Sequence, residues 1–371
     1  MKALVLGKGK SGTSAAALLK AQGYEVDFVD GYDCVVTSPG LRTKSELQLG
    51  CEELKRRGWK LLAVTGSKGK SSVVKVVAEA IGGVPCGNYG RPVTELISEK
   101  PGWAVVEISS FMMETTTLPP DTFEAAAILN LQEDHLDRHG SVEVYHGLKR
   151  KLLTFAVRTF VNEGVSSERP NIGASEHLWK GSYFDNETLG GNAAIAVELM
   201  RVAGLDDVKI AAAFKAFKPL PHRMNLVAEI AGVRYLDDSK ATSLAALIAG
   251  VKMASSILHP ASFVPHSSIR LIAGGLPKGD DPKTALSTLT ERVKKVYLIG
   301  QSAEAFFAAW NSAVDCEICG TMDKAVETAR REAETGEAVL LSPGTASFDQ
   351  FQSYEERGDV FARLVKKGQP K

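Results

Sequence analysis

A glycine-rich loop joins an apolar run to a helical run close to residue 65. Residues 61–65 have the composition of a buried strand, and the loop GSKGKSS follows at 66–72. Between a strand and a helix, such a loop turns backbone N–H groups and the helix N-terminus towards phosphate oxygens. The pattern therefore predicts an α/β fold that contains a nucleotide site.

Two polar side chains in this loop suit a nucleoside triphosphate. Lys70 can reach the β and γ phosphates, and the hydroxyl of Ser71 can ligate Mg²⁺. The strict phosphate-loop pattern has a glycine five residues before Gly69, where this chain has Val64. The loop alone therefore leaves a simple strand-to-helix turn as an alternative.

Strand-like and helix-like runs alternate along all 371 residues, as a largely parallel α/β architecture requires. We expect three domains, at residues 1–59, 60–218 and 219–371. The second boundary falls where the prolines of 218–221 interrupt the helical pattern. The predicted strands lie at 3–6, 26–30, 34–37, 61–65, 103–108, 126–130, 233–236, 269–273, 296–299 and 338–341.

Charge and cysteine content exclude several classes of function. The 44 basic and 44 acidic residues give no overall field for nucleic acid or an anionic membrane, so the expected partners are small molecules. No run reaches the roughly 18 apolar residues of a membrane span, and the N-terminus lacks signal-peptide features. Five cysteines are typical of reduced thiols, which predicts a cytoplasmic protein. Cys316 and Cys319 form a C-x-x-C, but no second pair completes a zinc site.

The N-terminus carries a dinucleotide-binding pattern. Gly7, Gly9 and Gly12 follow the first strand, and Asp30 ends the next one. Alone, this pattern favours NAD. A dinucleotide fold with two halves has six strands, however, and the second nucleotide loop begins at Thr65, which leaves too little chain. A phosphate loop with a following acidic residue suits UDP equally well.

Four ordered motifs in the first half resemble those of the Mur ligases and their folylpolyglutamate-synthetase relatives. TGSKGKSS at 65–72 is similar to their TGTNGKST, and GNYGRP at 87–92 to GNIGxP. EISSFMME at 107–114 resembles ELSSFQLE, and residues 128–139 resemble ILNxxxDHLDRH. The resemblance implies an ATP-dependent amide ligase with a Rossmann-like N-terminal domain, a P-loop central domain and a Rossmann-like C-terminal domain.

Making an amide with ATP proceeds through an acyl phosphate, whose crowded negative charges need cations. The resemblance implies ATP contacts at Thr65, Gly66, Ser67, Lys68, Gly69, Lys70, Ser71 and Ser72. It implies two Mg²⁺ ions on Ser71, Glu107, His135 and a carbamylated Lys149, and catalytic roles for Lys70, His135, Lys149 and Lys240. A carbamate forms on a neutral amine, which burial and nearby cations favour. A solvated helix face at 149–151 and an N-cap or core role for His135 remain alternatives.

The second half continues the resemblance. LPHR at 220–223, DDSKATS at 237–243 and LSPGTASFDQF at 341–351 are similar to the family's LPHR, NDSKATN and LSPACASxDQF. The last pattern is typical of members that add D-glutamate. Further ATP contacts implied by the resemblance are Asn192, Arg223 and Asp238. Implied substrate contacts are Lys10, Ser11 and Asp30 for UDP and, elsewhere, Asn88, Thr242, Lys278, Ser347, Phe348 and Tyr354.

The resemblance favours a monomeric ligase that joins D-glutamate to UDP-N-acetylmuramoyl-L-alanine. Two alternatives stay open. Another Mur or folylpolyglutamate-type ligase would share the central motifs, and a nucleotide-responsive binding protein of the same fold could have lost turnover. The short N-terminal domain and the incomplete HNxxN motif, of which only Asn192 is present, keep the second alternative open.

Overall fold

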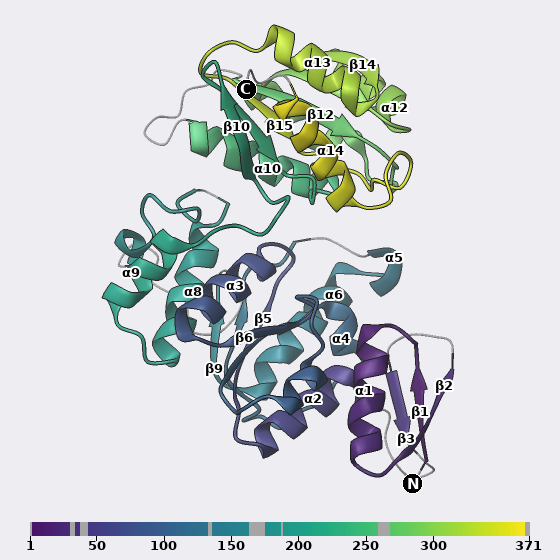
Figure 1. The fold of residues 1–371 in the computed structure, drawn as a ribbon, viewed down its shortest axis with the longest axis vertical. Helices are drawn as coiled ribbons and strands as arrows, with labels where there is room; N and C mark the ends of the chain where they lie inside the picture. Colours follow the sequence, from purple (N-terminus) through teal and green to yellow (C-terminus); the bar gives the residue numbers. More distant parts are fainter. Residues whose placement is uncertain are drawn as a thin grey trace. The chain divides into compact units, whose positions relative to one another are not determined.

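A computed structural model describes residues 2–29, 34–37, 44–132, 136–162, 175–186, 188–258 and 268–367. Two predicted site residues, Asp30 and His135, lie outside this description. The chain divides into two compact units (Figure 1). The first comprises Met1–Asp185 and Leu189–Phe217, and the second comprises Asn186–Thr188 and Lys218–Lys371.

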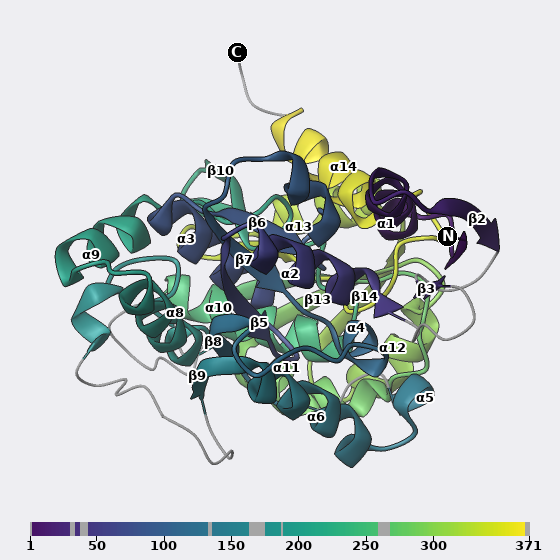
Figure 2. The ribbon, with the colours of Figure 1, turned by 90° about the horizontal axis from the view of Figure 1, so that it is seen from below.

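The larger sheet of the first unit is parallel throughout. Its strand order is β6-β7-β5-β8-β9, which can be followed in Figure 2. The central strand β5 (Lys60–Thr65) is buried from Leu61 onwards, because both faces of a central parallel strand are covered. The other strands are β6 (Val84–Gly87), β7 (Trp103–Glu107), β8 (Phe123–Ile128) and β9 (Ala156–Val161).

Helices cover both faces of this sheet (Figure 2). Helix α3 (Lys70–Ile81) begins after the left-handed Gly69 and packs against β7, α8 (Gly190–Val202) and α9 (Asp207–Ala216). On the opposite face, α2 (Glu46–Arg56) and α4 (Ser110–Glu114) contribute to a core with Leu61 and Ala63. The remaining helical segments are η1 (Val93–Ser98), α5 (Leu136–His139), α6 (Val142–Lys151), η2 (Leu152–Phe155) and η3 (Glu176–Leu178).

The smaller sheet of the first unit is mixed. Its order is β2-β1-β3-β4, and the strands are β1 (Lys2–Leu6), β2 (Glu25–Val29), β3 (Cys34–Thr37) and β4 (Lys44–Ser45). β1 is parallel to β2 but antiparallel to β3, which departs from the expected parallel pattern. Helix α1 (Lys10–Ala21) packs on this sheet, and the Thr94 hydroxyl lies within hydrogen-bonding distance of Ser14 of α1 and Glu46 of α2.

The second unit contains one six-stranded sheet of order β10-β11-β15-β12-β13-β14, in which only β10 and β11 pair antiparallel among the described strands. Helices α13 and α14 cover one face, and α10, α11 and α12 contact the sheet elsewhere. The strands are β10 (Asn225–Ile230), β11 (Val233–Asp237), β12 (Ile269–Gly274), β13 (Val293–Ile299), β14 (Asp315–Gly320) and β15 (Ala338–Leu341). The helices are α10 (Leu244–Leu258), η4 (Pro282–Ala285), α11 (Leu286–Arg292), α12 (Ala303–Trp310), α13 (Met322–Glu332) and α14 (Tyr354–Lys366).

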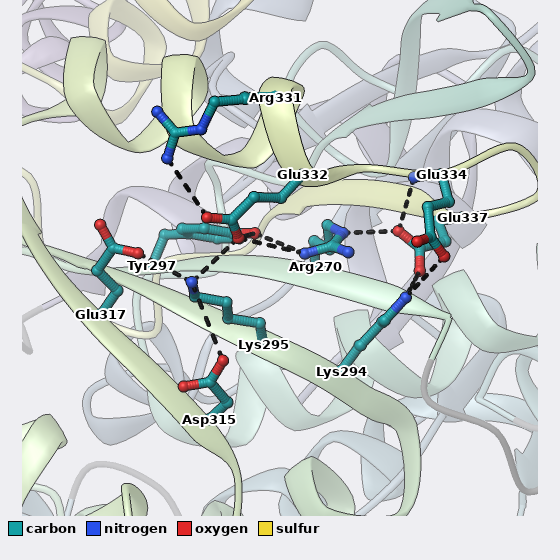
Figure 3. A network of polar contacts seen from close by, with 10 residues as sticks. All are labelled: Arg270, Lys294, Lys295, Tyr297, Asp315, Glu317, Arg331, Glu332, Glu334 and Glu337. Carbon is teal, nitrogen blue, oxygen red and sulfur yellow. Dashed lines mark hydrogen bonds and ion pairs between the residues drawn. The ribbon is translucent and has the colours of Figure 1, made fainter.

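A network of charges closes the amino-terminal edge of this sheet (Figure 3). The buried Arg270 donates to Glu337 at 2.6 Å and to the hydroxyl of Tyr297 at 2.8 Å. That hydroxyl donates in turn to Glu332, which also pairs with Lys295. Because each buried charge has an opposite charge beside it, the network fits a structural role.

These findings confirm an α/β fold with a strand near each predicted position. Cys316 and Cys319 lie in β14, in which both thiols are buried. No helix in the described part of the chain has the length and apolar composition needed to cross a bilayer.

Candidate active site

The glycine loop after β5 lies at the carboxyl edge of the parallel sheet. Gly66 and Gly69 have φ angles of 152° and 81°, which side-chain-bearing residues rarely adopt. A Cβ atom on Gly69 would lie 2.1 Å from Nδ2 of Asn192, so only glycine allows α8 to approach the loop. Thr65 is buried and donates from Oγ1 to the carbonyl oxygen of Ile108 at 2.8 Å.

Asn130, which follows β8, holds the loop in shape. Its Oδ1 accepts hydrogen bonds from the backbone nitrogens of Ser67 at 3.1 Å and Lys68 at 2.8 Å. Its Nδ2 donates to the carbonyl oxygen of Lys68 at 2.9 Å. Asn130 is not among the predicted site residues, although it is part of the ILN segment of its motif, which is the signal that could have identified it.

Two lysine side chains reach the same carbonyl oxygen in this loop. Lys70 and Lys149 each place Nζ 2.9 Å from the oxygen of Gly66. Lys149 is only 1% exposed, and its Nζ lies 4.5 Å from the centre of the Tyr145 ring. If residues 149–151 formed a solvated helix face, the side chain of Lys149 would be exposed. It is buried, so this alternative does not hold for Lys149.

Glu107, at the end of β7, offers an open carboxylate oxygen beside the loop. β-pairing places it next to Val64, one residue before Thr65. The side chain is 2% exposed; Oε1 accepts from Nδ2 of Asn88 at 3.0 Å, whereas Oε2 makes no hydrogen bond within the described residues. A buried carboxylate oxygen of this kind fits a divalent cation, for which oxygen ligands are preferred. Ser71, the second residue of α3, follows the loop on the same edge.

The second unit presents its predicted site residues at the carboxyl edge of its own sheet. Asp238 follows β11 and accepts from the Ser342 hydroxyl at 3.0 Å. Burial raises the pKa of Asp238 to about 7, although the Ser342 hydrogen bond and the charge of Arg223 act in the opposite direction. Next to it, Lys240 places Nζ 3.7 Å from the centre of the Tyr354 ring.

The other predicted contacts of this unit lie on loops that meet at the same edge. The loop after β12, which carries Lys278, pairs through Leu276 with Ala346 of the segment after β15. Ser347 is buried, whereas Phe348 is 68% exposed and Lys278 is exposed too. Thr242 is half-buried in the segment after β11.

Arg357 on α14 is a residue of this site that the sequence analysis missed. Its side chain is fully buried and donates to the carbonyl oxygens of Ser239, Thr345 and Ala346. The sequence signal for it is YEERG at 354–358, which follows the LSPGTASFDQF motif. Burial lowers the pKa of Arg357 to about 10, so the guanidinium group remains charged at neutral pH.

The N-terminal phosphate pattern also adopts the expected local structure. Gly7 has a φ of 93° and donates to Val29 of β2 at 2.8 Å, and α1 begins at Lys10 with Ser11 next. Lys10 is exposed, so its ammonium group can meet a ligand at the helix N-terminus.

Taken together, two groups of predicted residues are assembled in the structure. The first group surrounds the carboxyl edge of the first unit's parallel sheet. It consists of Thr65 to Ser72, Asn88, Glu107, Lys149 and Asn192, together with Asn130. The second group lies on segments at the carboxyl edge of the second unit's sheet. It consists of Arg223, Asp238, Lys240, Thr242, Lys278, Ser347 and Tyr354, together with Arg357. Clusters of three or more His, Cys, Asp or Glu side chains are absent from the described residues.

Family models match both groups. Residues 64–162 match the Mur ligase middle domain, and residues 222–344 match the model described as Mur ligase, glutamate ligase domain. A curated relative from Francisella philomiragia subsp. philomiragia, named UDP-N-acetylmuramoylalanine–D-glutamate ligase, is 31% identical, and the match covers 98% of this chain and 96% of the relative. A relative of the same name from Acidobacterium capsulatum is 32% identical, with the same two coverages.

Solved structures share the fold at lower identity. The MurF ligase from Thermotoga maritima in complex with ADP has a TM-score of 0.62 and 18% identity, over 99% of this chain and 95% of that chain. The bifunctional folylpolyglutamate synthase/dihydrofolate synthase from Yersinia pestis, complexed with AMPPNP and Mn ion, has a TM-score of 0.61 and 16% identity, over 96% and 100%.

Proposed function

This chain belongs to the Mur ligase family, and we propose that it joins D-glutamate to UDP-N-acetylmuramoyl-L-alanine with the conversion of ATP to ADP and phosphate. The observation that carries the amino-acid assignment is the match of 98% of the chain to relatives named for that reaction. The ATP-dependent chemistry is supported by the loop geometry around Gly66 and the open carboxylate oxygen of Glu107. The product is a peptidoglycan precursor, and the reaction takes place in the cytoplasm.

The central group of residues binds and orients ATP. Backbone N–H groups of residues 66–72 and the N-terminus of α3 face the phosphates, and Lys70 neutralises the transferred phosphoryl group. Asn192 lies against the loop beside the adenine, and Asp238 and Arg223 meet the ribose and phosphates from the second unit. Lys70 belongs to the first unit and Lys240 to the second, and we assign a catalytic role to each.

Divalent cations fit the donor set next to this loop. Ser71, Glu107, His135 and Lys149 would hold two Mg²⁺ ions, which supply charge neutralisation for the phosphates. Carbamylation of Lys149 is supported by the burial of its side chain next to the loop, where Nζ reaches the carbonyl oxygen of Gly66.

The chemical steps follow from this arrangement. The alanyl carboxylate of the UDP substrate takes the γ-phosphoryl group, giving an acyl phosphate and ADP. The amine of D-glutamate then attacks the acyl carbon, and the tetrahedral intermediate expels phosphate as the amide forms. Lys240 faces the reacting carbonyl, while Thr242, Lys278 and Ser347 hold the carboxylates of D-glutamate, with Phe348 and Tyr354 at the pocket edge.

The UDP substrate is bound by the first unit. Lys10 and Ser11 contact its diphosphate at the N-terminus of α1, Asp30 meets the uracil end, and Asn88 lies nearer the reaction centre beside Glu107. We assign residues 1–59, 60–218 and 219–371 to the UDP-binding, ATP-binding and amino-acid-binding domains, and we propose that the enzyme acts as a monomer.

Phosphate release from ATP tests this proposal. Purified protein is incubated with Mg²⁺ and UDP-N-acetylmuramoyl-L-alanine, and D-glutamate is compared with L-glutamate, L-alanine and L-lysine. We expect release that depends on both the UDP substrate and D-glutamate. Release with another amino acid would move the chain to another ligase of the family, and no release under any pairing would favour a nucleotide-responsive binding protein.

A further inference from the structure

The buried guanidinium group of Arg357 forms its hydrogen bonds with neutral groups in the described part of the chain, although the charges of Asp349 and Asp237 also act on it. The side chain is 0% exposed, and each of its hydrogen bonds within the described chain goes to a carbonyl or hydroxyl oxygen. Burying a cation that no carboxylate hydrogen-bonds is costly, so the hydrogen bonds that satisfy its donors matter for the fold around it. The bonds of Arg357 show what it fixes.

The first segment that it holds follows β11. Nε lies 3.0 Å from Oγ of Ser239, and Nη2 donates to the carbonyl oxygen of Ser239 at 2.9 Å. Ser239 lies directly before Lys240 and three residues before Thr242. The Ser239 hydroxyl also donates to the carbonyl oxygen of Tyr354, on the same helix as Arg357, at 2.8 Å. Arg357 therefore ties α14 to the segment that carries Lys240 and Thr242.

The second and third segments follow β15 and β12. Nη1 donates to the carbonyl oxygens of Thr345 and Ala346, both at 3.2 Å, directly before Ser347. Ala346 exchanges backbone hydrogen bonds with Leu276 at 2.9 and 3.2 Å, two residues before Lys278. A Cβ atom on Gly275 would lie 2.4 Å from the Ala346 oxygen and 3.2 Å from Nη1, so only glycine lets these segments meet.

These three segments carry the proposed contacts with the carboxylates of D-glutamate. We infer that Arg357 is a positioning residue for the amino-acid substrate, whose guanidinium group sets the separation of the loops that bear Thr242, Lys278 and Ser347. This inference rests on the proposed function. Arginine suits the task because its planar fork directs several donors at once, whereas a lysine ammonium group on a flexible stem cannot reach the same oxygens.

The first test is Arg357→Lys, which keeps the charge and removes the fork. We expect KM for D-glutamate to rise about 10-fold to 100-fold, because small displacements of binding groups have effects of that size. KM for ATP should change less, because the phosphate loop lies in the other unit and only Asp238, next to Ser239, is a proposed ATP contact on the segments that Arg357 holds. A residue with a purely structural role would lower the yield of folded enzyme and leave KM for D-glutamate unchanged, and that result would overturn the inference.

Chemical rescue provides a second measurement. Arg357→Ala leaves a cavity of guanidinium shape, so millimolar guanidinium should lower KM for D-glutamate in this variant, and the same concentration of ammonium should not. Arg363→Ala removes an exposed arginine of the same helix and is the matched control, with unchanged kinetics. Equal effects of guanidinium on both variants would contradict a specific role for Arg357. If Arg357 variants do not fold, Ser239→Ala removes the Nε contact and the hydroxyl's bond to Tyr354 but keeps the other bonds of Arg357, and it should raise KM for D-glutamate by a smaller factor.

Hydrogen exchange separates this inference from the proposed function. Without substrate, Arg357→Lys should raise amide exchange in the segments around 238–243, 274–278 and 343–348 more than elsewhere in the second unit. If wild-type enzyme released no phosphate with any amino acid, the proposed function would fail while this exchange pattern still tested the anchoring. Exchange that is unchanged, or raised evenly throughout the unit, would show that Arg357 does not hold these loops.

Discussion

The ammonium nitrogen of Lys149 lies 2.9 Å from the carbonyl oxygen of Gly66, the first residue of the nucleotide loop. The two residues are far apart in sequence, yet helix α6 delivers the lysine to the loop as a buried side chain. Because its side chain lies next to the nucleotide loop, Lys149 is close to where we propose that the phosphates and their cations bind. A lysine exposed on the outer face of the helix would not be.

Replacement of Lys149 tests the proposed carbamate. Lys149→Ala should lower kcat by at least ~100-fold. Losing a residue that only hydrogen-bonds to a metal ligand typically costs about 10-fold to 100-fold, and losing the ligand itself should cost more. A short carboxylic acid added to this variant should restore part of the rate, since its carboxylate can occupy the place of the carbamate. Arg150→Ala, which removes the exposed neighbour on the same helix, is the control and should retain activity. A variant that is inactive and shows no response to any short acid would count against the carbamate.

Lys70 should be required for formation of the acyl phosphate. Its position on the loop lets Nζ move from the oxygen of Gly66 to the transferred phosphoryl group. We expect Lys70→Ala to reduce ADP formation in a single turnover without D-glutamate by roughly 10²–10³-fold, as for other groups that stabilise a developing charge. Lys209→Ala, at an exposed position of the same unit, should behave as wild type. Normal ADP formation by Lys70→Ala would remove this lysine from the mechanism.

The hydrogen bonds of Asn130 should matter for nucleotide affinity. Asn130→Ala removes two acceptor bonds and one donor bond that shape the loop at Ser67 and Lys68. At about 1 kcal/mol for each net hydrogen bond, the loss of three bonds corresponds to ATP binding that is weaker by up to roughly 150-fold. Asn130→Asp keeps the acceptor but adds a negative charge next to the phosphates, so it should weaken binding further at low ionic strength. Titration with a non-hydrolysable ATP analogue measures both, and equal affinities for wild type and Asn130→Ala would contradict the role.

The sequence predicted those parts of the fold that depend on local pattern. The strand–loop–helix at 61–81 was predictable because an apolar run, two glycines with special φ angles and a helical run are adjacent in the chain. The direction of β3 was not, because antiparallel pairing with β1 depends on contacts between segments rather than on either segment's composition.

The same distinction explains which site residues were missed. Arg357 and Asn130 act through bonds to backbone atoms of other segments, and no spacing rule identifies such partners. The burial of Lys149 was likewise hidden, since the run Lys149-Arg150-Lys151 reads as three exposed charges until the helix is placed against the loop.

The raised pKa of Asp238 predicts how stability depends on pH. Burial favours the protonated carboxyl in the folded protein, so its pKa of about 7 lies above the ordinary value of 3.8. A group of this kind contributes stability below the unfolded pKa, and the contribution is lost as pH rises through the folded pKa. Between about pH 4 and 7, wild type should therefore lose stability relative to Asp238→Asn, with an upper bound of ~1.4 kcal/mol for each pH unit. The bound is not reached in full, because the side chain is half-buried rather than fully enclosed.

Melting temperatures of the two proteins, measured across this range in one buffer series, give the difference directly. Asp359→Asn, at an exposed carboxylate of the same unit, is the control and should show no such trend relative to wild type. A constant offset between wild type and Asp238→Asn from pH 4 to 8 would mean that Asp238 is ionised in the folded protein throughout, as an exposed carboxylate is. A difference that changes in favour of Asp238→Asn as pH rises would show that the folded protein raises the pKa of the Asp238 carboxyl group.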